Sequence, residues 1–244
     1  MRVKLPKLGW VITSEQLPRN TKFSNPRVVF DNKYWYITVG VEVQVTNTKP
    51  TGKPIGIDVG IKILATLSNG MVYENPAKLQ KVKKLTKKLK SEQRKCAKKY
   101  KKGDVTKNYL KAKRTVQRIY RKIANIRNNA CHQMTADVVK TKPSVIVIED
   151  LNVSGMMKNH KLARAVAEVS FAEIRRQLEY KCRLNGIELK IADRFYPSSK
   201  TCSVCGNKKD TLSLSERTYH CEHCGTVIDR DLNAAINLAK LATA

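Results

Sequence analysis

The sequence contains little acidic charge. Of its 244 residues only 20 are Asp or Glu, against 48 Lys or Arg, and the formal net charge is +28 at pH 7. Such an excess is greater than solubility requires, and it is typical of proteins whose positive charge is neutralised by a polyanion. The composition therefore predicts nucleic acid as the partner. An anionic membrane surface is the alternative, but the basic segments lack the bulky Trp, Phe and Leu face of an interfacial helix.

Long apolar runs are also missing from the sequence. No stretch approaches the roughly 20 apolar residues that a membrane-spanning helix needs, and the first ten residues lack the apolar segment of a secretory signal peptide. We therefore expect a cytoplasmic protein without a membrane partner. The hydrophobic content of 41% suffices for one large domain or two smaller ones. The sequence leaves the oligomeric state open.

Cysteine is limited to seven residues, an odd number that does not suggest a set of disulfides. Four of them form two Cys-x-x-Cys pairs, with fifteen residues between the pairs: Cys202, Cys205, Cys221 and Cys224. This spacing predicts a zinc site, and four thiolates saturate a tetrahedral ion, so the zinc is expected to be structural. A redox pair is the alternative for each motif. His220 and His223 are alternative ligands within the same segment.

The first 50 residues are rich in β-branched and aromatic runs, at 27–30, 34–39 and 41–45, with a turn at 31–33. They predict a small antiparallel sheet that forms part of a barrel. Beyond them, alternating apolar runs and helical patterns predict α/β organisation with a βαβ unit. The strands are expected at 55–60, 63–67, 71–73, 144–148 and 187–191. Helices are expected at 164–185, before Gly186, and at 232–242.

Residues 76–141 predict two long helices that form an antiparallel hairpin, with a break near 102–104. Between Lys78 and Arg127 there are 21 Lys or Arg residues and only two acids. A solvated helix face is the alternative interpretation, but such faces usually carry both signs of charge, so phosphate contact is favoured. The side chains expected to contact nucleic acid are Lys83, Lys84, Lys87, Lys88, Arg114, Arg118, Arg121, Lys200 and Arg230.

Three acidic positions lie at or near the ends of predicted strands or before the last helix. Asp58 stands within Ile-Gly-Ile-Asp-Val-Gly, Glu149 ends a buried-type strand, and Asp229 and Asp231 precede the last helix. If the strands are neighbours, these carboxylates can meet and bind Mg²⁺ for phosphodiester hydrolysis. The alternatives are a turn acid at Asp58, a helix N-cap at Glu149 or Asp150, and an N-cap at Asp231. An acid inside an apolar run is costly unless metal or a partner compensates it.

Four motifs in order resemble the TnpB family, the OrfB proteins of insertion sequences, which are related to type V CRISPR effectors. They are three RuvC-like motifs and the entry to a zinc ribbon, at 56–60, 146–151, 229–237 and 199–206. The resemblance covers residues 52–240. It implies a nuclease domain of the RNase H-like (RuvC) class, with Asp58, Glu149 and Asp231 as the metal-binding triad.

The family cleaves DNA at sites chosen by pairing with a guide RNA, so the resemblance implies DNA and guide RNA as partners, and zinc and magnesium as metals. A truncated protein that binds RNA or DNA without cleavage is the alternative. Residues 3–10 resemble the later half of the family's N-terminal barrel, so we expect an N-terminally truncated form. The expected domains are a partial barrel at 1–50, the RuvC-like domain at 51–197, the zinc ribbon at 198–227, and the final RuvC segment with its helix at 228–244.

Overall fold

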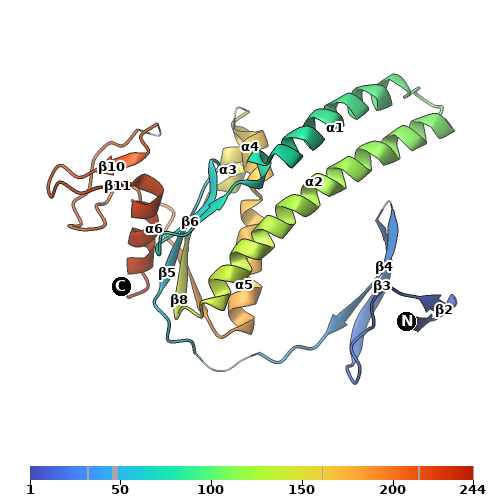
Figure 1. Cartoon of the computed structure of the whole chain (residues 1–244), viewed down its shortest axis with the longest axis horizontal. Helices are drawn as coiled ribbons and strands as arrows, with labels where there is room; N and C mark the ends of the chain where they lie inside the picture. Colours follow the sequence, from blue (N-terminus) through green and yellow to red (C-terminus); the bar gives the residue numbers. More distant parts are fainter. Residues whose placement is uncertain (32, 46–48, 161, 214, 244) are drawn as a thin grey trace. The chain divides into compact units, whose positions relative to one another are not determined.

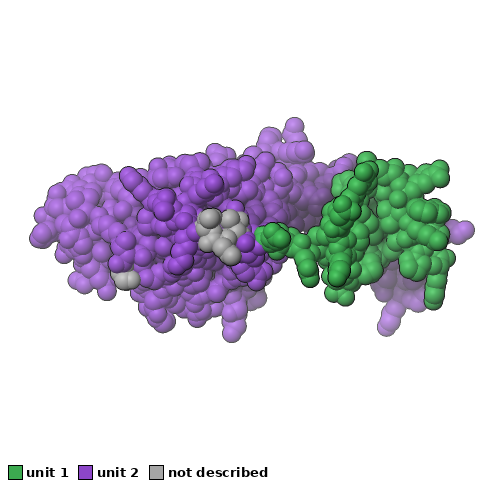
Figure 2. Space-filling model, turned by 90° about the horizontal axis from the view of Figure 1, so that it is seen from below, with its two compact units in different colours: residues 1–44 green, residues 45–244 purple. Residues whose placement is uncertain are grey.

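The chain divides into two compact units, Met1–Gln44 and Val45–Ala244, in a computed structural model (Figure 2). The structure describes residues 1–31, 33–45, 49–160, 162–213 and 215–243. The boundary between the units falls a few residues before position 50, where the sequence predicts the end of the first domain.

The first unit consists of two separate antiparallel sheets of two strands each. Strands β1 and β2 form one sheet, and β3 and β4 form the other; their bounds are Arg2–Leu5, Gly9–Ile12, Phe23–Asp31 and Tyr34–Val41. In the described residues these sheets are not closed into a barrel. The predicted turn includes Asn32, which lies outside the described residues.

The predicted strand at 41–45 is wrong, because β4 ends at Val41 and the described residues 42–45 form no strand. The run has the β-branched composition of a strand. A strand also needs a neighbouring strand for its backbone hydrogen bonds, and composition does not indicate whether one is present. The four residues after Val41 that the structure describes are exposed, so water can satisfy their backbone groups.

A five-stranded mixed sheet forms the centre of the second unit, with the order β7-β6-β5-β8-β9. The bounds of β5 to β9 are Ile55–Val59, Ile63–Leu67, Val72–Glu74, Val145–Glu149 and Glu188–Ala192. Strands β5, β6 and β7 are antiparallel to one another in sequence order, and β8 and β9 continue the sheet parallel to β5. The arrangement confirms the predicted α/β class and its βαβ unit.

The two faces of this sheet contact different helices (Figure 1). Ile55 and Ile57 of β5 belong to the main core, together with residues of α2 and α5. On the opposite face, Val147 of β8 packs against Leu238 of α6. Since side chains alternate along a strand, Gly56 and position 58 of β5 face the α6 side.

The predicted hairpin is confirmed as α1 (Gln80–Lys98) and α2 (Lys107–Lys140), which lie side by side in Figure 1. A short 3-10 helix, η1 (Pro76–Lys78), precedes them. The hairpin has its own small core of Val82, Leu89, Ile119 and Ile123. The apolar side chains are therefore used between the helices, and the lysines and arginines are left mostly at the surface.

The segment between β8 and β9 contains three helices, α3 (Val153–Lys158), α4 (Ala163–Val169) and α5 (Phe171–Leu184). The sequence predicts a single helix over 164–185, which is wrong at Ser170. This residue adopts a left-handed conformation with φ 61°, so the backbone turns between α4 and α5. Gly186 follows α5 with φ 66°, as expected for a residue that ends a helix.

The final segment contains β10 (Thr218–His220), β11 (Val227–Asp229) and α6 (Arg230–Lys240). The two strands form an antiparallel pair within the cysteine-containing segment. The last helix begins two residues earlier than the sequence predicts. None of the described helices is long and apolar enough to cross a membrane.

Candidate active site and zinc site

Asp58 and Glu149 lie at the carboxyl ends of two neighbouring parallel strands. In the register of β5 and β8, Ile57 stands opposite Ile148, so the next residue of each strand is an acid. Both acids share the face that carries Gly56 and Val147, because side chains alternate. The sheet thus brings together two carboxylates that are 91 positions apart in the sequence.

The third acid, Asp231, is in the first turn of α6. This helix approaches β5 closely at Gly56, where an added Cβ would lie 2.0 Å from the carbonyl oxygen of Ala235. Ala235 is one turn after Asp231, so the close contact fixes the beginning of the helix beside the end of β5. Glycine is required at position 56 because a larger residue would not leave room for the helix backbone.

Asp229, rather than Asp231, is the N-cap of α6. Its Oδ1 accepts hydrogen bonds from the backbone N–H groups of Asp231 at 3.0 Å and Leu232 at 2.9 Å. The alternative interpretation of Asp231 as the N-cap is therefore wrong. The cap occupies the Asp229 carboxylate and leaves the Asp231 side chain available for another role.

Glu149 and Asp231 both act electrostatically on Asp58. Burial raises the pKa of the Asp58 carboxyl well above its ordinary value, and the carboxylates of Glu149 and Asp231 raise it further. Arg230 offsets part of this effect. The raised pKa of Asp58 reflects negative charge that is gathered near it. A divalent cation bound by the three carboxylates would neutralise this charge.

The three carboxylates are spaced more widely than the ligands of one small ion. Among the described residues, the four cysteines are the one group of three or more potential metal ligands gathered within 4.8 Å. Such spacing suits two ions, which in two-metal sites are about 3.5–4 Å apart.

Two acids have contacts with the segment that contains the cysteines. Ser198, which is buried, donates a hydrogen bond from Oγ to Oε1 of Glu149. Arg217 places Nη1 3.5 Å from Oδ1 of Asp231. The cysteine-containing segment therefore contributes directly to the arrangement of the acids.

Asp150 is next to Glu149 but is used differently. Its carboxylate forms ion pairs with Arg175 at 3.2 Å and Arg194 at 2.5 Å. The helix that follows is capped by Asn152, not by either acid, because Asn152 Oδ1 accepts from the N–H of Gly155. The N-cap interpretation of Glu149 and Asp150 is therefore wrong, and the ion pairs of Asp150 separate its role from that of Glu149.

The four cysteines have the geometry of a tetrahedral zinc site. The Sγ atoms of Cys202 and Cys224 are 3.7 Å apart, and those of Cys205 and Cys221 are 3.6 Å apart. Zinc–sulfur bonds of about 2.3 Å in a tetrahedron place sulfur atoms about 3.8 Å from each other. The cluster is thus compatible with zinc, and neither His220 nor His223 belongs to it.

Each cysteine pair lies in a tight turn that ends in a glycine. The N–H of Gly206 donates to the carbonyl of Cys202 at 3.0 Å, and the N–H of Gly225 donates to the carbonyl of Cys221 at 2.9 Å. Both glycines have positive φ, 78° and 73°. The two halves of the site therefore repeat the same backbone turn, which aims both thiols of a pair toward one point.

Two buried asparagines of α6 attach the cysteine segment to the helix. Asn233 donates from Nδ2 to the carbonyl of Thr201 at 2.8 Å and accepts from the N–H of Ser203 at 2.8 Å. Asn237 donates from Nδ2 to the carbonyls of Ser198 at 2.8 Å and Thr201 at 2.7 Å. Neither asparagine is among the functional residues expected from the sequence. The two asparagines are four positions apart on a helix rich in Ala and Leu, so they lie on the same face of the helix. This spacing is the sequence signal that could have identified them as a pair.

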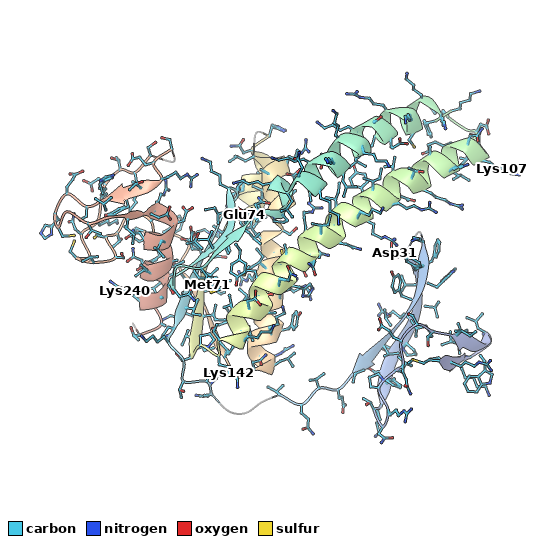
Figure 3. The ribbon with its side chains drawn as sticks, viewed as in Figure 1. Asp31, Met71, Glu74, Lys107, Lys142 and Lys240 are labelled. Carbon is cyan, nitrogen blue, oxygen red and sulfur yellow. The ribbon has the colours of Figure 1, made fainter. Side chains whose placement is uncertain are left out.

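The predicted nucleic-acid contacts fall into two groups. On the hairpin, Lys83, Lys84, Lys87, Lys88, Arg114 and Arg118 are exposed, and Arg121 is half-buried. Figure 3 shows side chains that project along both helices. Lys200 and Arg230 instead have contacts inside the cysteine segment: Lys200 Nζ donates to the carbonyl of Asp210 at 2.7 Å, and Arg230 Nη1 donates to that of Ser213 at 2.8 Å. Contact of these nine side chains with nucleic acid stays a prediction.

Comparisons with known proteins agree with the motifs. Residues 37–160 match the OrfB_IS605 family, described as "Probable transposase", and residues 171–238 match "Cas12f1-like, TNB domain". A protein of Streptomyces pristinaespiralis named "Putative RNA-guided DNA endonuclease" is 38% identical over 205 residues, which are 84% of this chain and 49% of the relative. "Putative RNA-guided DNA endonuclease InsQ" of Escherichia coli K12 is 34% identical over 97% of this chain and 61% of the relative. "TnpB-like protein L79" of Acanthamoeba polyphaga mimivirus is 31% identical over 56% of this chain and 26% of the relative.

Solved structures share the fold. The structure titled "Cryo-EM structure of the Cas12f1-sgRNA-target DNA complex" matches 90% of this chain and 46% of that chain, with TM-score 0.61 and 22% identity. A "CRISPR-Cas12f Ternary Complex" matches 84% of this chain and 42% of that chain, with TM-score 0.55 and 20% identity. The chain spans about half to three fifths of the length of the first two curated relatives. With the family model matched over half of its residues, the chain belongs to the OrfB_IS605 family, the TnpB family that its motifs resemble.

Proposed function

We propose that the chain is a metal-dependent DNA endonuclease of the TnpB type, with Asp58, Glu149 and Asp231 as ligands for Mg²⁺. The observation that supports it is the meeting of two strand-end carboxylates with a third from the start of α6. Divalent cations held by these oxygens supply Lewis-acid catalysis for phosphodiester hydrolysis.

The protein's own groups orient these ligands. Strands β5 and β8 hold Asp58 and Glu149 at fixed neighbouring positions, and the Ser198 hydroxyl fixes one oxygen of Glu149. The Asp229 cap keeps the first turn of α6 in place and so orients Asp231. Arg217 balances part of the charge of Asp231.

The proposed partners are target DNA and a guide RNA. The relatives from Streptomyces pristinaespiralis and Escherichia coli are named as RNA-guided DNA endonucleases, and the 22%-identical structure is titled as a complex with guide RNA and target DNA. The net charge of +28 is suited to such polyanions. The cysteine cluster is proposed to bind structural zinc, and the domain limits expected from the sequence, at 50, 197 and 227, are kept as part of this proposal.

The test uses the full chain purified with its associated RNA, which is sequenced to design a matching DNA target. Asp58→Asn is expected to abolish Mg²⁺-dependent cleavage, because it removes one ligand charge with little change in shape. Asp150→Asn is the matched control, since this carboxylate pairs with arginines. The proposal is wrong if Asp58→Asn cleaves at the wild-type rate. If the wild-type chain binds the target but never cleaves it, the binding-protein alternative replaces it.

A further inference from the structure

A cavity of about 520 Å³ lies between α1, α2 and α4, and it includes neither the three acids nor the cysteines. Three lysines line it from α1: Lys83, Lys87 and Lys90. In the described part of the chain, none of the three has an ion pair or a hydrogen bond to its side chain. The α1 wall of the cavity therefore presents uncompensated positive charge.

Two arginines complete the charged lining. Arg164 pairs with Glu168, with its Nε 2.9 Å from Oε1, so the one carboxylate of the lining is already neutralised. Arg127 donates from Nη1 to the carbonyl of Ala167 at 3.2 Å, while its buried Nε has no acceptor among the described residues. A guanidinium has five N–H groups, and a buried one without an acceptor is unfavourable. The lining thus holds five cations against one carboxylate and has unused donors, which fits an anionic ligand.

The rest of the lining is apolar and aromatic. Val82, Leu89 and Ile123, from the hairpin core, form part of the wall. Tyr120 also lines the cavity; it is 49% exposed, and its hydroxyl accepts a hydrogen bond from Gln93 Nε2 at 2.7 Å. This bond restricts the orientation of the ring. A phosphate alone would use the cations but not this apolar surface.

We propose that the cavity binds one unpaired nucleotide of a single-stranded segment of nucleic acid. The phosphate contacts the α1 lysines and Arg127, and the base stacks on Tyr120 beside the apolar wall. Aromatic stacking next to a basic groove is the general means of binding single strands. The volume lies within the range of about 300–1,000 Å³ that is usual for small-ligand sites. The site deepens the proposed function, on which it rests for nucleic acid as the ligand, but binding there requires neither Mg²⁺ nor the three acids.

The test compares two double variants of α1 that remove the same charge. Lys83→Ala with Lys87→Ala removes two lining lysines, and Lys81→Ala with Lys98→Ala removes two exposed lysines of α1 that do not line the cavity. Binding of a labelled 12-nucleotide oligo-dT or oligo-U is measured by fluorescence anisotropy in EDTA at fixed salt. The lining pair is expected to weaken binding at least about tenfold and the other pair about threefold or less. If both double variants lose the same factor in affinity, the binding reflects general charge attraction and the proposal is overturned.

A second series examines the base. Tyr120→Leu is expected to weaken single-strand binding about tenfold, to leave duplex binding unchanged, and to be rescued by Tyr120→Phe, which keeps the ring. An abasic oligonucleotide should bind the wild-type chain about tenfold more weakly than the normal strand does. Equal binding of the abasic and normal strands would overturn the nucleotide site in favour of a phosphate site. Circular dichroism and thermal melting establish that each variant is folded. Because EDTA removes divalent cations, failure here leaves the cleavage test unaffected.

Discussion

Replacement of Gly56 by alanine should damage the candidate active site without altering any of its acids. The added Cβ would lie 2.0 Å from the carbonyl oxygen of Ala235, 2.5 Å from the backbone nitrogen of Ala239 and 2.9 Å from Cβ of Leu238. Two of these atoms are backbone, so no side-chain rotation relieves the overlap. Since carbon contacts begin at about 3.5 Å, α6 must withdraw from β5 by roughly 1 Å or more.

The withdrawal has two measurable costs. Overpacking of this kind destabilises by about 1–3 kcal/mol, and a backbone clash on this scale belongs at the upper end. For a chain of this size, 1 kcal/mol corresponds to about 2–4 °C in melting temperature, so a decrease of about 6–12 °C is expected. Asp231 moves with α6, and a misplacement of about 1 Å can reduce a reaction rate about a hundredfold.

Gly60→Ala is the matched control, because it places the same methyl group two residues after Asp58 instead of two before it. Its Cβ would meet a single atom, the carbonyl oxygen of Ile63, at 3.1 Å. Neither glycine has a positive φ, so backbone strain does not separate the two variants. Thermal melting and Mg²⁺-dependent cleavage are measured for both. The reasoning is refuted if Gly56→Ala melts and cleaves like Gly60→Ala.

Three other perturbations have definite expected outcomes. Ser198→Ala removes the hydrogen bond to Glu149. It is expected to reduce the cleavage rate about 10–100-fold at limiting Mg²⁺, with partial recovery at high Mg²⁺. An unchanged cleavage rate would contradict this role of Ser198. Cys202→Ser, or zinc chelation, should abolish cleavage even with excess Mg²⁺ and should make α6 sensitive to proteases. Full activity of the chelated protein would exclude a structural zinc. Glu173 has its pKa lowered to about 2, first by the hydrogen bond from Arg176 and then by that from Gln177. This stabilisation is present above the ordinary pKa of 4.5 and disappears as pH falls toward 2, so Glu173→Gln should be less stable than wild type at pH 7 and equally stable near pH 2, as measured by urea unfolding.

The sequence predicted the features that depend on short-range patterns. Apolar periodicity located the hairpin, because the residues that pack between α1 and α2 recur at helical spacing. The Asn69–Gly70 pair between β6 and β7 has the sequence signature of a hairpin turn, and Gly70 adopts φ 87°, which few other residues tolerate. The cysteine spacing predicted four ligands that the structure gathers at one point.

Other features depend on partners that are distant in the sequence. The residues after Val41 have strand composition but find no partner strand among the described residues. The break at Ser170 interrupts a helical pattern that has no Gly or Pro to signal it. Lys200 and Arg230 carry the same charge as the hairpin lysines, yet carbonyl oxygens of the cysteine segment bind their head groups. Composition identifies a cation, whereas tertiary contacts decide which acceptor it meets.

The three acids differ in how firmly the fold positions them. Asp58 and Glu149 belong to adjacent strands of the central sheet, so the same backbone hydrogen bonds that hold the core also fix their separation. Asp231 is held through α6, whose buried Asn233 and Asn237 bind backbone groups of the cysteine segment rather than of the sheet. Loss of zinc should therefore disturb Asp231 most and Asp58 least, while Glu149 would lose at most its hydrogen bond from Ser198. Cys202 is 29 positions before Asp231 and Cys224 is seven positions before it, and the structural effect of the cysteine cluster reaches Asp231 through α6.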